Sequence, residues 1–187
     1  SVEVIGVDGH PDQAFHATRV MNDVSRHVDA PVRIHCDTDS LIPIDQMLAA
    51  IDRVRRGDAD VVLPFSFGIG VPQSERDEFA RGEIRLERVV RPRPMVGVPP
   101  GLCQVWSAEA FERAGMENER LIGWAPDDSE RLERLAILDM RVERIPGPAL
   151  HMDHSAVAGR DDEHAPLRVD RRRRRVGGSR EEAALLL

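Results

Sequence analysis

The segment of residues 32–43 constrains the fold more than any other part of the chain. It begins with an alternation of apolar and polar residues that is typical of a half-buried β-strand, and it continues into Asp37 and Asp39. In open α/β sheets, ligands bind just beyond the carboxyl ends of the strands. Two carboxylates at such a place, with no lysine or arginine beside them, suit a hard divalent cation. A polar turn that caps the following helix accounts for the same two residues, so this segment alone leaves both interpretations open.

Strand-like and helix-like patterns alternate around this segment. Residues 2–7 and 60–65 have the apolar, β-branched character of strands, and Asp8 follows the first of them. Residues 13–28 and 44–54 carry apolar side chains at helical spacing. This alternation predicts an α/β sheet with crossover helices. The residues expected to face the core are Ala17, Val20, Met21, Val24 and Val28 in the first helix and Ile44, Met47, Leu48, Ile51 and Val54 in the second.

The composition favours one soluble domain. The chain has 187 residues, of which 41% are hydrophobic and 32% are charged, as in globular proteins with a sizeable core. Its formal net charge of −7 argues against nucleic acid as a partner. We find no apolar run long enough to cross a membrane and no signal pattern. Cys36 and Cys103 have no ligand or disulfide spacing, so we expect two buried thiols in a cytoplasmic protein.

Two segments of the second half differ in character from the core. Residues 66–100 are rich in glycine, proline and charge, which predicts a functional loop or lid, or else an ordinary surface insertion. Residues 159–187 include five consecutive arginines, and we expect a flexible tail there. The elements expected between these segments are strands at 104–106 and 141–145 and helices at 107–115 and 127–138.

Phe15, Arg19 and Asn22 lie on one stripe of the first predicted helix, because they are four and three residues apart. An aromatic ring and a guanidinium on the same stripe are able to hold the base and a phosphate of a nucleotide. A solvated helix face with one half-buried phenylalanine explains the same spacing.

Further acidic and imidazole groups lie near the ends of predicted elements. Asp127 and Asp128 precede a helix, where carboxylates cap the N-terminus or, beside a cation, serve as a general base. His151 and His154 follow a proline–glycine turn, and both reach one ion only if the chain turns between them. Oxygen ligands together with an imidazole favour Mn²⁺, or Mg²⁺, over a metal bound by thiolates.

Taken in order, these motifs resemble those of the GT-A glycosyltransferases. The likeness is closest to the family 2 enzymes and to the β-1,4-galactosyltransferase-like catalytic domain. The motifs that carry it are Phe15…Arg19…Asn22, Asp37-Thr38-Asp39-Ser40-Leu41-Ile42-Pro43, Gly101, Gly123-Trp124-Ala125-Pro126-Asp127-Asp128 and His151-Met152-Asp153-His154.

The resemblance implies a hexosyltransferase that moves a sugar from a nucleotide diphosphate sugar to an acceptor hydroxyl. It favours a UDP-sugar as the donor and a glycan or small molecule as the acceptor. It also implies inversion at the anomeric carbon. It implies that Asp39 binds Mn²⁺ directly and that Asp37 contacts the metal or the ribose. It also implies that Asp128 is the base and that Asp127 touches the acceptor. His154 would complete the metal shell, with His151 as an extra ligand. The residues expected to contact the donor are Asp8, Phe15, Arg19, Asn22, Asp37 and Trp124.

The same resemblance implies a GT-A-type, Rossmann-like α/β fold over residues 1–158, with a mixed, mostly parallel sheet flanked by helices. The chain departs from the family pattern at Ala125-Pro126, which replace the usual Gly-x, and at Asp127, where glutamate is common. A single strand precedes Phe15, whereas a usual GT-A domain has a further strand and helix. We therefore expect an N-terminally truncated or minimal version of the fold.

Two other functions are consistent with part of the pattern. Phosphatases of the haloacid dehalogenase type also place Asp-x-Asp after a strand, but they prefer Thr or Val where this chain has Leu41, and they use a lysine, which the chain lacks. A degenerate glycosyltransferase-like module would bind a nucleotide, a glycan or a partner protein without catalysis. The short N-terminus favours this module, and the two aspartate pairs with His154 oppose it.

Overall fold

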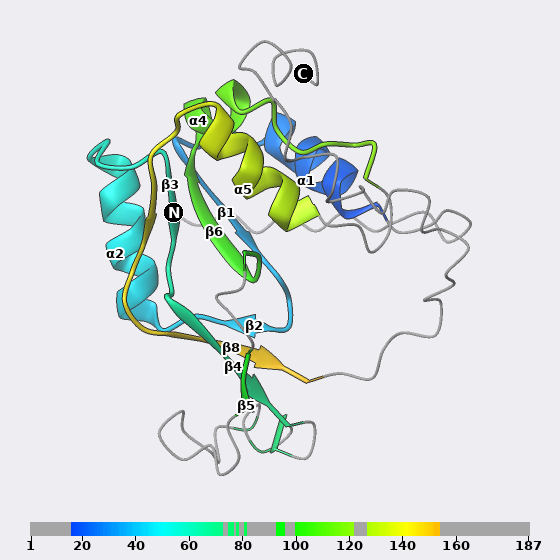
Figure 1. The fold of residues 1–187 in the computed structure, drawn as a ribbon, viewed down its shortest axis with the longest axis vertical. Coiled ribbons are helices and arrows are strands. Elements are labelled where there is room, and N and C mark those ends of the chain that lie inside the picture. The colour runs from blue at the N-terminus through cyan, green and yellow to red at the C-terminus, as the bar shows by residue number, and fades with distance from the viewer. Residues whose placement is uncertain are drawn as a thin grey trace.

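The computed structural model describes residues 16–72, 75–76, 78, 81, 93–95, 100–121 and 127–153. These residues form two four-stranded sheets with helices packed around the first sheet (Figure 1). The predicted strand at residues 2–7 and the predicted tail at residues 159–187 lie outside the described residues. Among the described residues, no helix combines the length and apolar character that crossing a membrane requires.

The first sheet has the strand order β1-β6-β3-β7. Its strands are β1 (Val32–Cys36), β6 (Cys103–Ser107), β3 (Val61–Leu63) and β7 (Val142–Arg144). Successive side chains on β3 and β6 point to opposite faces of the sheet. The cross-strand pair Val61 and Trp106 therefore packs into one core, and the next pair, Val62 and Val105, packs into another.

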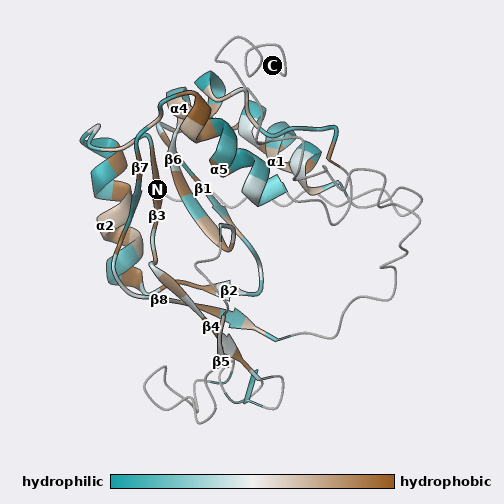
Figure 2. Ribbon diagram, viewed as in Figure 1, coloured by the Kyte–Doolittle hydropathy of each residue, from teal (hydrophilic) through white to brown (hydrophobic). Residues whose placement is uncertain are grey.

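Helices cover both faces of this sheet, so the core has three layers (Figure 1). Residues of α4 (Ala108–Arg113) and α5 (Asp127–Ile137) pack with Val61 and Trp106 on one face. Residues of α2 (Ile44–Arg55) pack with Val62 and Val105 on the other. The ribbon of β3 is largely hydrophobic, whereas α1 (Ala17–His27) and α5 are largely hydrophilic (Figure 2).

The second sheet has the order β2-β8-β4-β5. It contains β2 (Ser40–Leu41), β8 (Pro148–Met152), β4 (Phe67–Val71) and β5 (Arg93–Pro94). A buried cluster joins the two sheets, because it takes residues from the end of β3, the start of β6 and the middle of β8. Its buried members are Leu63, Phe65, Leu102, Cys103 and Ala149.

The mixed α/β class is confirmed, as are the strands predicted at 60–65, 104–106 and 141–145. The mostly parallel pairing is not seen in the described part of the chain. Only β3 with β7 and β4 with β8 are parallel there, and the other described strand pairs are antiparallel. Sequence patterns identify strands but do not state which strands pair, and the mostly parallel sheet was implied by the resemblance alone.

Part of the segment predicted as a loop belongs to the second sheet. Residues 67–71 form β4, and the glycines that suggested a loop, Gly68 and Gly70, are buried within it. The stretch between Pro72 and β5 is described only in part, and its role as a lid stays a prediction.

Both helices predicted before β3 exist, but each is rotated relative to its predicted face. In α1 the buried residues are Thr18, Asn22 and Ser25, while the apolar stripe is half-exposed. In α2 the side chains of Ile44 and Leu48 are exposed instead of buried. Met47, Ile51 and Val54 pack into the core as predicted. The buried residues of α2 are Gln46, Ala50 and Val54.

Hydrogen bonds to distant backbone explain both rotations. Asn22 donates to the carbonyl of Glu117 and accepts from its backbone N–H, at 3.0 and 2.8 Å. Gln46 donates to the carbonyls of Pro64 and Pro148, at 2.6 and 3.0 Å. Buried backbone groups need such partners, so the amides face inward at the expense of the apolar stripe. Gly147 makes room for Gln46, and its φ of +135° is one that glycine adopts readily.

Candidate functional site

Asp37 and Asp39 lie in the turn that joins the two sheets. The N–H of Asp37 donates to the carbonyl of Leu102 at 2.9 Å, which continues the pairing of β1 with β6. The N–H of Ser40 then donates back to the carbonyl of Asp37 at 3.1 Å, which closes the turn. The carbonyl of Asp39 accepts from the N–H of Met152 at 2.8 Å, so β8 fixes the far side of the turn. The sequence-based prediction that Asp37 follows a β-strand is confirmed.

His151 comes to Asp39 from β8. Ser40 and His151 are cross-strand partners between β2 and β8. This register brings Nε2 of His151 to 3.4 Å from Oδ2 of Asp39. The two predicted metal ligands therefore meet although they are far apart in the sequence. His154, the other histidine of the predicted set, lies outside the described residues.

Asp128 approaches the same place from the first turn of α5. Its carboxylate lies against Gly101, where a Cβ atom would overlap its oxygens. Glycine is therefore needed at position 101 because a side chain there would leave no room for the Asp128 carboxylate. The backbone itself does not require glycine, because the φ of Gly101 is not in the left-handed region. Together, burial and the charges of Asp128 and Asp39 raise the pKa of Asp37 to about 6. Three carboxylates from two distant segments therefore share one electrostatic environment.

A buried arginine holds Asp128 in position. Arg131 donates to Oδ1 of Asp128 at 3.0 Å, and its NH2 group lies 3.8 Å from Oδ2 of Asp127. It also makes a 2.9 Å ion pair with Glu117, and the side chains of Arg131 and Glu117 are 3% and 1% exposed. Nδ1 of His35 lies 3.6 Å from the other oxygen of Glu117. A network that begins in the core thus ends on the two predicted catalytic aspartates.

The pKa values follow from this arrangement. Burial would raise the pKa of Glu117, but the adjacent His35 ring and the charge of Arg131 lower it below its usual value. The pKa of Asp127 is raised by burial and by the charge of Asp128, against the opposing effect of Arg131. Glu117 is therefore charged at neutral pH, and Asp127 holds a proton more readily than an exposed aspartate.

The sequence analysis did not identify Glu117, Arg131 or His35. One signal was available, because Asp127 and Asp128 lie four and three residues before Arg131, a spacing that brings side chains together on a helix. Nothing in the spacing indicated Glu117 or His35, which reach the network from the segment after α4 and from β1.

The described residues contain no group of three or more His, Cys, Asp or Glu side chains arranged to hold a metal ion. Asp39 and His151 lie 3.4 Å apart, and a carboxylate and an imidazole are ligand types that Mn²⁺ and Mg²⁺ accept. The raised pKa of Asp37 is a second observation that fits a cation, because a positive charge would stabilise the carboxylates that repel one another.

The predicted nucleotide contacts are described only in part. Asp8, Phe15 and Trp124 lie outside the described residues. Arg19 is exposed and lies 3.9 Å from Asp23. The amide of Asn22 is engaged with the segment that carries Glu117, which links α1 to the Arg131 network. The nucleotide role of Arg19 and Asn22 stays a prediction.

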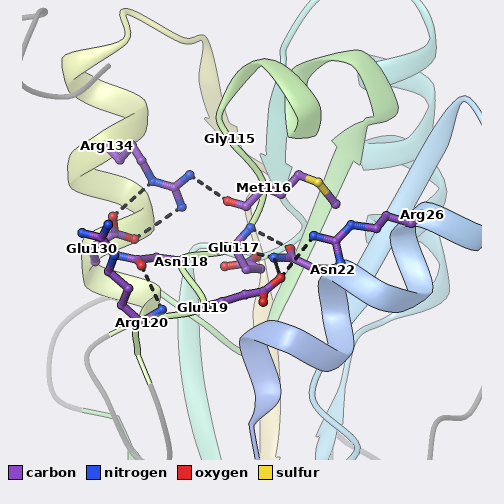
Figure 3. Close-up of a pocket in the computed structure, with 10 residues that line it drawn as sticks. All are labelled: Asn22, Arg26, Gly115, Met116, Glu117, Asn118, Glu119, Arg120, Glu130 and Arg134. Carbon is purple, nitrogen blue, oxygen red and sulfur yellow. Dashed lines mark hydrogen bonds and ion pairs between the residues drawn. The ribbon is translucent and has the colours of Figure 1, made fainter. Parts of the chain in front are cut away.

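A polar pocket of about 270 Å³ lies between α1, the segment after α4, and α5 (Figure 3). Polar groups on its wall already bind one another. Asn22 donates to Glu119 at 2.8 Å, and Arg134 donates to the carbonyl of Met116 at 2.7 Å. Its lining does not include Asp37, Asp39 or Asp128. We therefore assign the candidate site to the aspartates and not to this pocket.

The two cysteines are placed differently from the prediction. Cys36 is exposed and Cys103 is buried, and they are cross-strand partners on β1 and β6. The interaction of the two thiols lowers the pKa of Cys36 below its usual value, while the same interaction and burial raise the pKa of Cys103. The expectation of a buried thiol is confirmed for Cys103 and was wrong for Cys36. Sequence spacing does not reveal the strand register that pairs them.

Comparison of the chain with models of known protein families finds no match. Comparison with curated proteins finds no match either.

Proposed function

We propose that this chain is a metal-dependent glycosyltransferase, which moves a sugar from a nucleotide diphosphate sugar to an acceptor hydroxyl with inversion at the anomeric carbon. The observation that carries the proposal is the meeting of Asp37, Asp39, Asp128 and His151, which come from three segments: the turn after β1, α5 and β8. The resemblance in the sequence assigned these residues to one site before any geometry was known.

Asp128 is the proposed base. Its Oδ1 lies 3.0 Å from NH1 of Arg131, and this ion pair fixes the position of the carboxylate that would accept the proton. Its side chain is 40% exposed, so an acceptor hydroxyl is able to reach it. In the proposed reaction the acceptor oxygen bonds to the anomeric carbon as its proton passes to Asp128. The bond from that carbon to the diphosphate oxygen breaks, and the electron pair leaves on the diphosphate.

Asp39 and Asp37 are the proposed ligands of a divalent cation, with His151 and His154 as imidazole ligands. Such a cation, when bound, neutralises negative charge that develops on a departing diphosphate. Asp127, beside the base and held near Arg131, is the proposed contact for the acceptor. A UDP-sugar is the proposed donor, and a glycan or small molecule is the proposed acceptor.

A binding module without catalysis is the second candidate. It is favoured by the engagement of Asp128 with Arg131 and by the lack of a complete metal-ligand group among the described residues. The two candidates differ in one measurable property, which is turnover of the donor.

The test is calorimetric titration of the full chain with UDP and Mn²⁺, followed by assays of donor hydrolysis and sugar transfer with a set of UDP-sugars. If the chain is the proposed enzyme, Asp39→Ala should abolish UDP–Mn²⁺ binding. Asp128→Asn should still bind UDP–Mn²⁺, but its turnover of the donor should fall by at least about 100-fold. The control is Asp29→Asn, an exposed aspartate in the segment between α1 and β1. Binding without turnover in the unmodified chain identifies the module. Absence of UDP–Mn²⁺ binding rejects the enzyme and favours a module that binds a partner protein.

A further inference from the structure

Cys36 and Cys103 are the two cysteines of the chain, and the fold places them opposite each other at one end of the first sheet. They are separated by 66 residues in the sequence, so only the pairing of β1 with β6 brings them together. As directly opposed cross-strand partners, their side chains project from the same face of the sheet.

The hydrogen-bond pattern shows which kind of cross-strand position they occupy. The N–H of Asp37 donates to Leu102, and at the other end of the ladder the N–H of Ala108 donates to Pro31. Hydrogen-bonded and non-hydrogen-bonded pairs alternate along antiparallel strands, so both bonds place Cys36 and Cys103 in a non-hydrogen-bonded pair. Cα atoms of such pairs are about 4.5 Å apart. That spacing lies within the range of roughly 4.4–6.8 Å that disulfides accept.

The two thiols differ in access to solvent. Cys36 is exposed, so it is reached first by an oxidant in solution. Cys103 is 1% exposed and lies directly behind it, packed among Leu63, Phe65 and Leu102. An exposed thiol with a buried neighbour is the arrangement of an attacking and a resolving cysteine.

We propose that Cys36 and Cys103 are a redox modification site that forms an intramolecular disulfide when a peroxide is present. The sulfur of Cys36 attacks the peroxide, so an S–O bond forms, the O–O bond breaks and water leaves. The sulfur of Cys103 then attacks the sulfenic acid at Cys36, the S–S bond forms, and a second water carries away the hydroxyl and the remaining proton. The two thiols are oxidised by two electrons, and the peroxide is reduced.

This modification site adjoins the candidate functional site without depending on it. The thiol of Cys36 lies 3.6 Å from the carbonyl of Asp37 and 4.0 Å from that of Ser40, within hydrogen-bonding range for sulfur. Disulfide formation removes the thiol hydrogen from both contacts and links the Asp37 turn to β6. The proposal holds or fails whether or not the chain transfers sugars.

The test treats the reduced full chain with hydrogen peroxide at mildly alkaline pH and follows thiols by N-ethylmaleimide labelling under denaturing conditions. The expected product is a monomer that has lost two hydrogens by mass and takes up no label, and that regains both labelling sites after dithiothreitol. In the chain unfolded in urea, this product should form at least about tenfold more slowly, because the strands no longer hold the thiols together.

Two variants separate proximity from reactivity. In Cys103→Ser, peroxide should add oxygen atoms to Cys36. The mass should show no loss of two hydrogens, because no partner thiol is present to form a disulfide. The double variant Cys103→Ser, Val105→Cys keeps two thiols but moves the partner two residues along β6, and it should not form the intramolecular disulfide. Three results would overturn the proposal: an oxygen-bearing Cys36 beside a Cys103 that still takes up label, disulfides only between chains, or equal oxidation rates in the folded and unfolded chain.

Discussion

At the scale of single residues, the pKa of Asp37 reports how the acidic side chains are arranged. Folding raises it from 3.8 to about 6, so the folded chain binds this proton more tightly than the unfolded chain does. The stability that the protonated carboxyl contributes is therefore present below about pH 4 and is lost as the pH rises through about 6. Asp37 is exposed as a whole residue although its carboxyl group is partly buried, so solvent screening keeps this contribution to about 1 kcal/mol.

Asp128→Asn should lower the pKa of Asp37, because it removes one of the two charges that raise it. The pKa should stay above 3.8, since burial is the largest cause of the shift. Carboxyl ¹³C NMR titration measures the change directly, with Asp29→Asn as the control. A pKa of Asp37 that is the same in both variants would show that Asp128 does not face it.

Gly101→Ala should destabilise the chain by about 1–3 kcal/mol, because the added Cβ overlaps the Asp128 carboxylate. The free energy of unfolding in urea measures this cost. The same substitution made together with Asp128→Ala should cost much less, since the overlapping group is then gone. Equal costs in the two backgrounds would mean that Gly101 is required for some other reason.

At the scale of elements, periodicity predicted that α1 and α2 exist but not how they are rotated. Asn22 and Gln46 are polar residues that a pattern-based analysis assigns to solvent, yet each satisfies backbone groups of a distant segment. A hydrogen bond to a buried backbone group outweighs the burial of a few half-exposed apolar side chains. Which backbone groups lack partners depends on the tertiary structure, so the sequence pattern contains no sign of it.

Asn22→Ala should destabilise the chain by about 2–3 kcal/mol, because the N–H and carbonyl of Glu117 lose their partner. Met21→Ala, on the stripe that the sequence predicted as core, should cost roughly 1 kcal/mol, since that side chain is only half-buried. Urea unfolding of both variants tests the ranking. If Met21→Ala costs more than Asn22→Ala, the rotation of α1 described above is incorrect.

At the scale of the whole molecule, strand positions could be predicted from the sequence and strand pairing could not. The apolar runs at 60–65 and 104–106 identify β3 and β6, but the antiparallel register between β1 and β6 depends on contacts across the sheet. That register decides that Cys36 meets Cys103. The pairing of β2 with β8, which the sequence also does not reveal, brings His151 to Asp39 in the candidate site. The sequence predicted several members of the site, and the Arg131 network that orients Asp128 became visible only in the fold.

The central claim is that Asp37 and Asp39 bind a divalent cation, and the pH dependence of Mn²⁺ binding tests it most directly. Calorimetry of the full chain with Mn²⁺ and UDP should show affinity that rises with pH through about 6, with release of a proton as Asp37 becomes charged. Asp39→Ala should abolish binding, and Asp29→Asn should leave it unchanged. Mn²⁺ binding that is independent of pH between about 5 and 8, or that persists in Asp39→Ala, would contradict the claim.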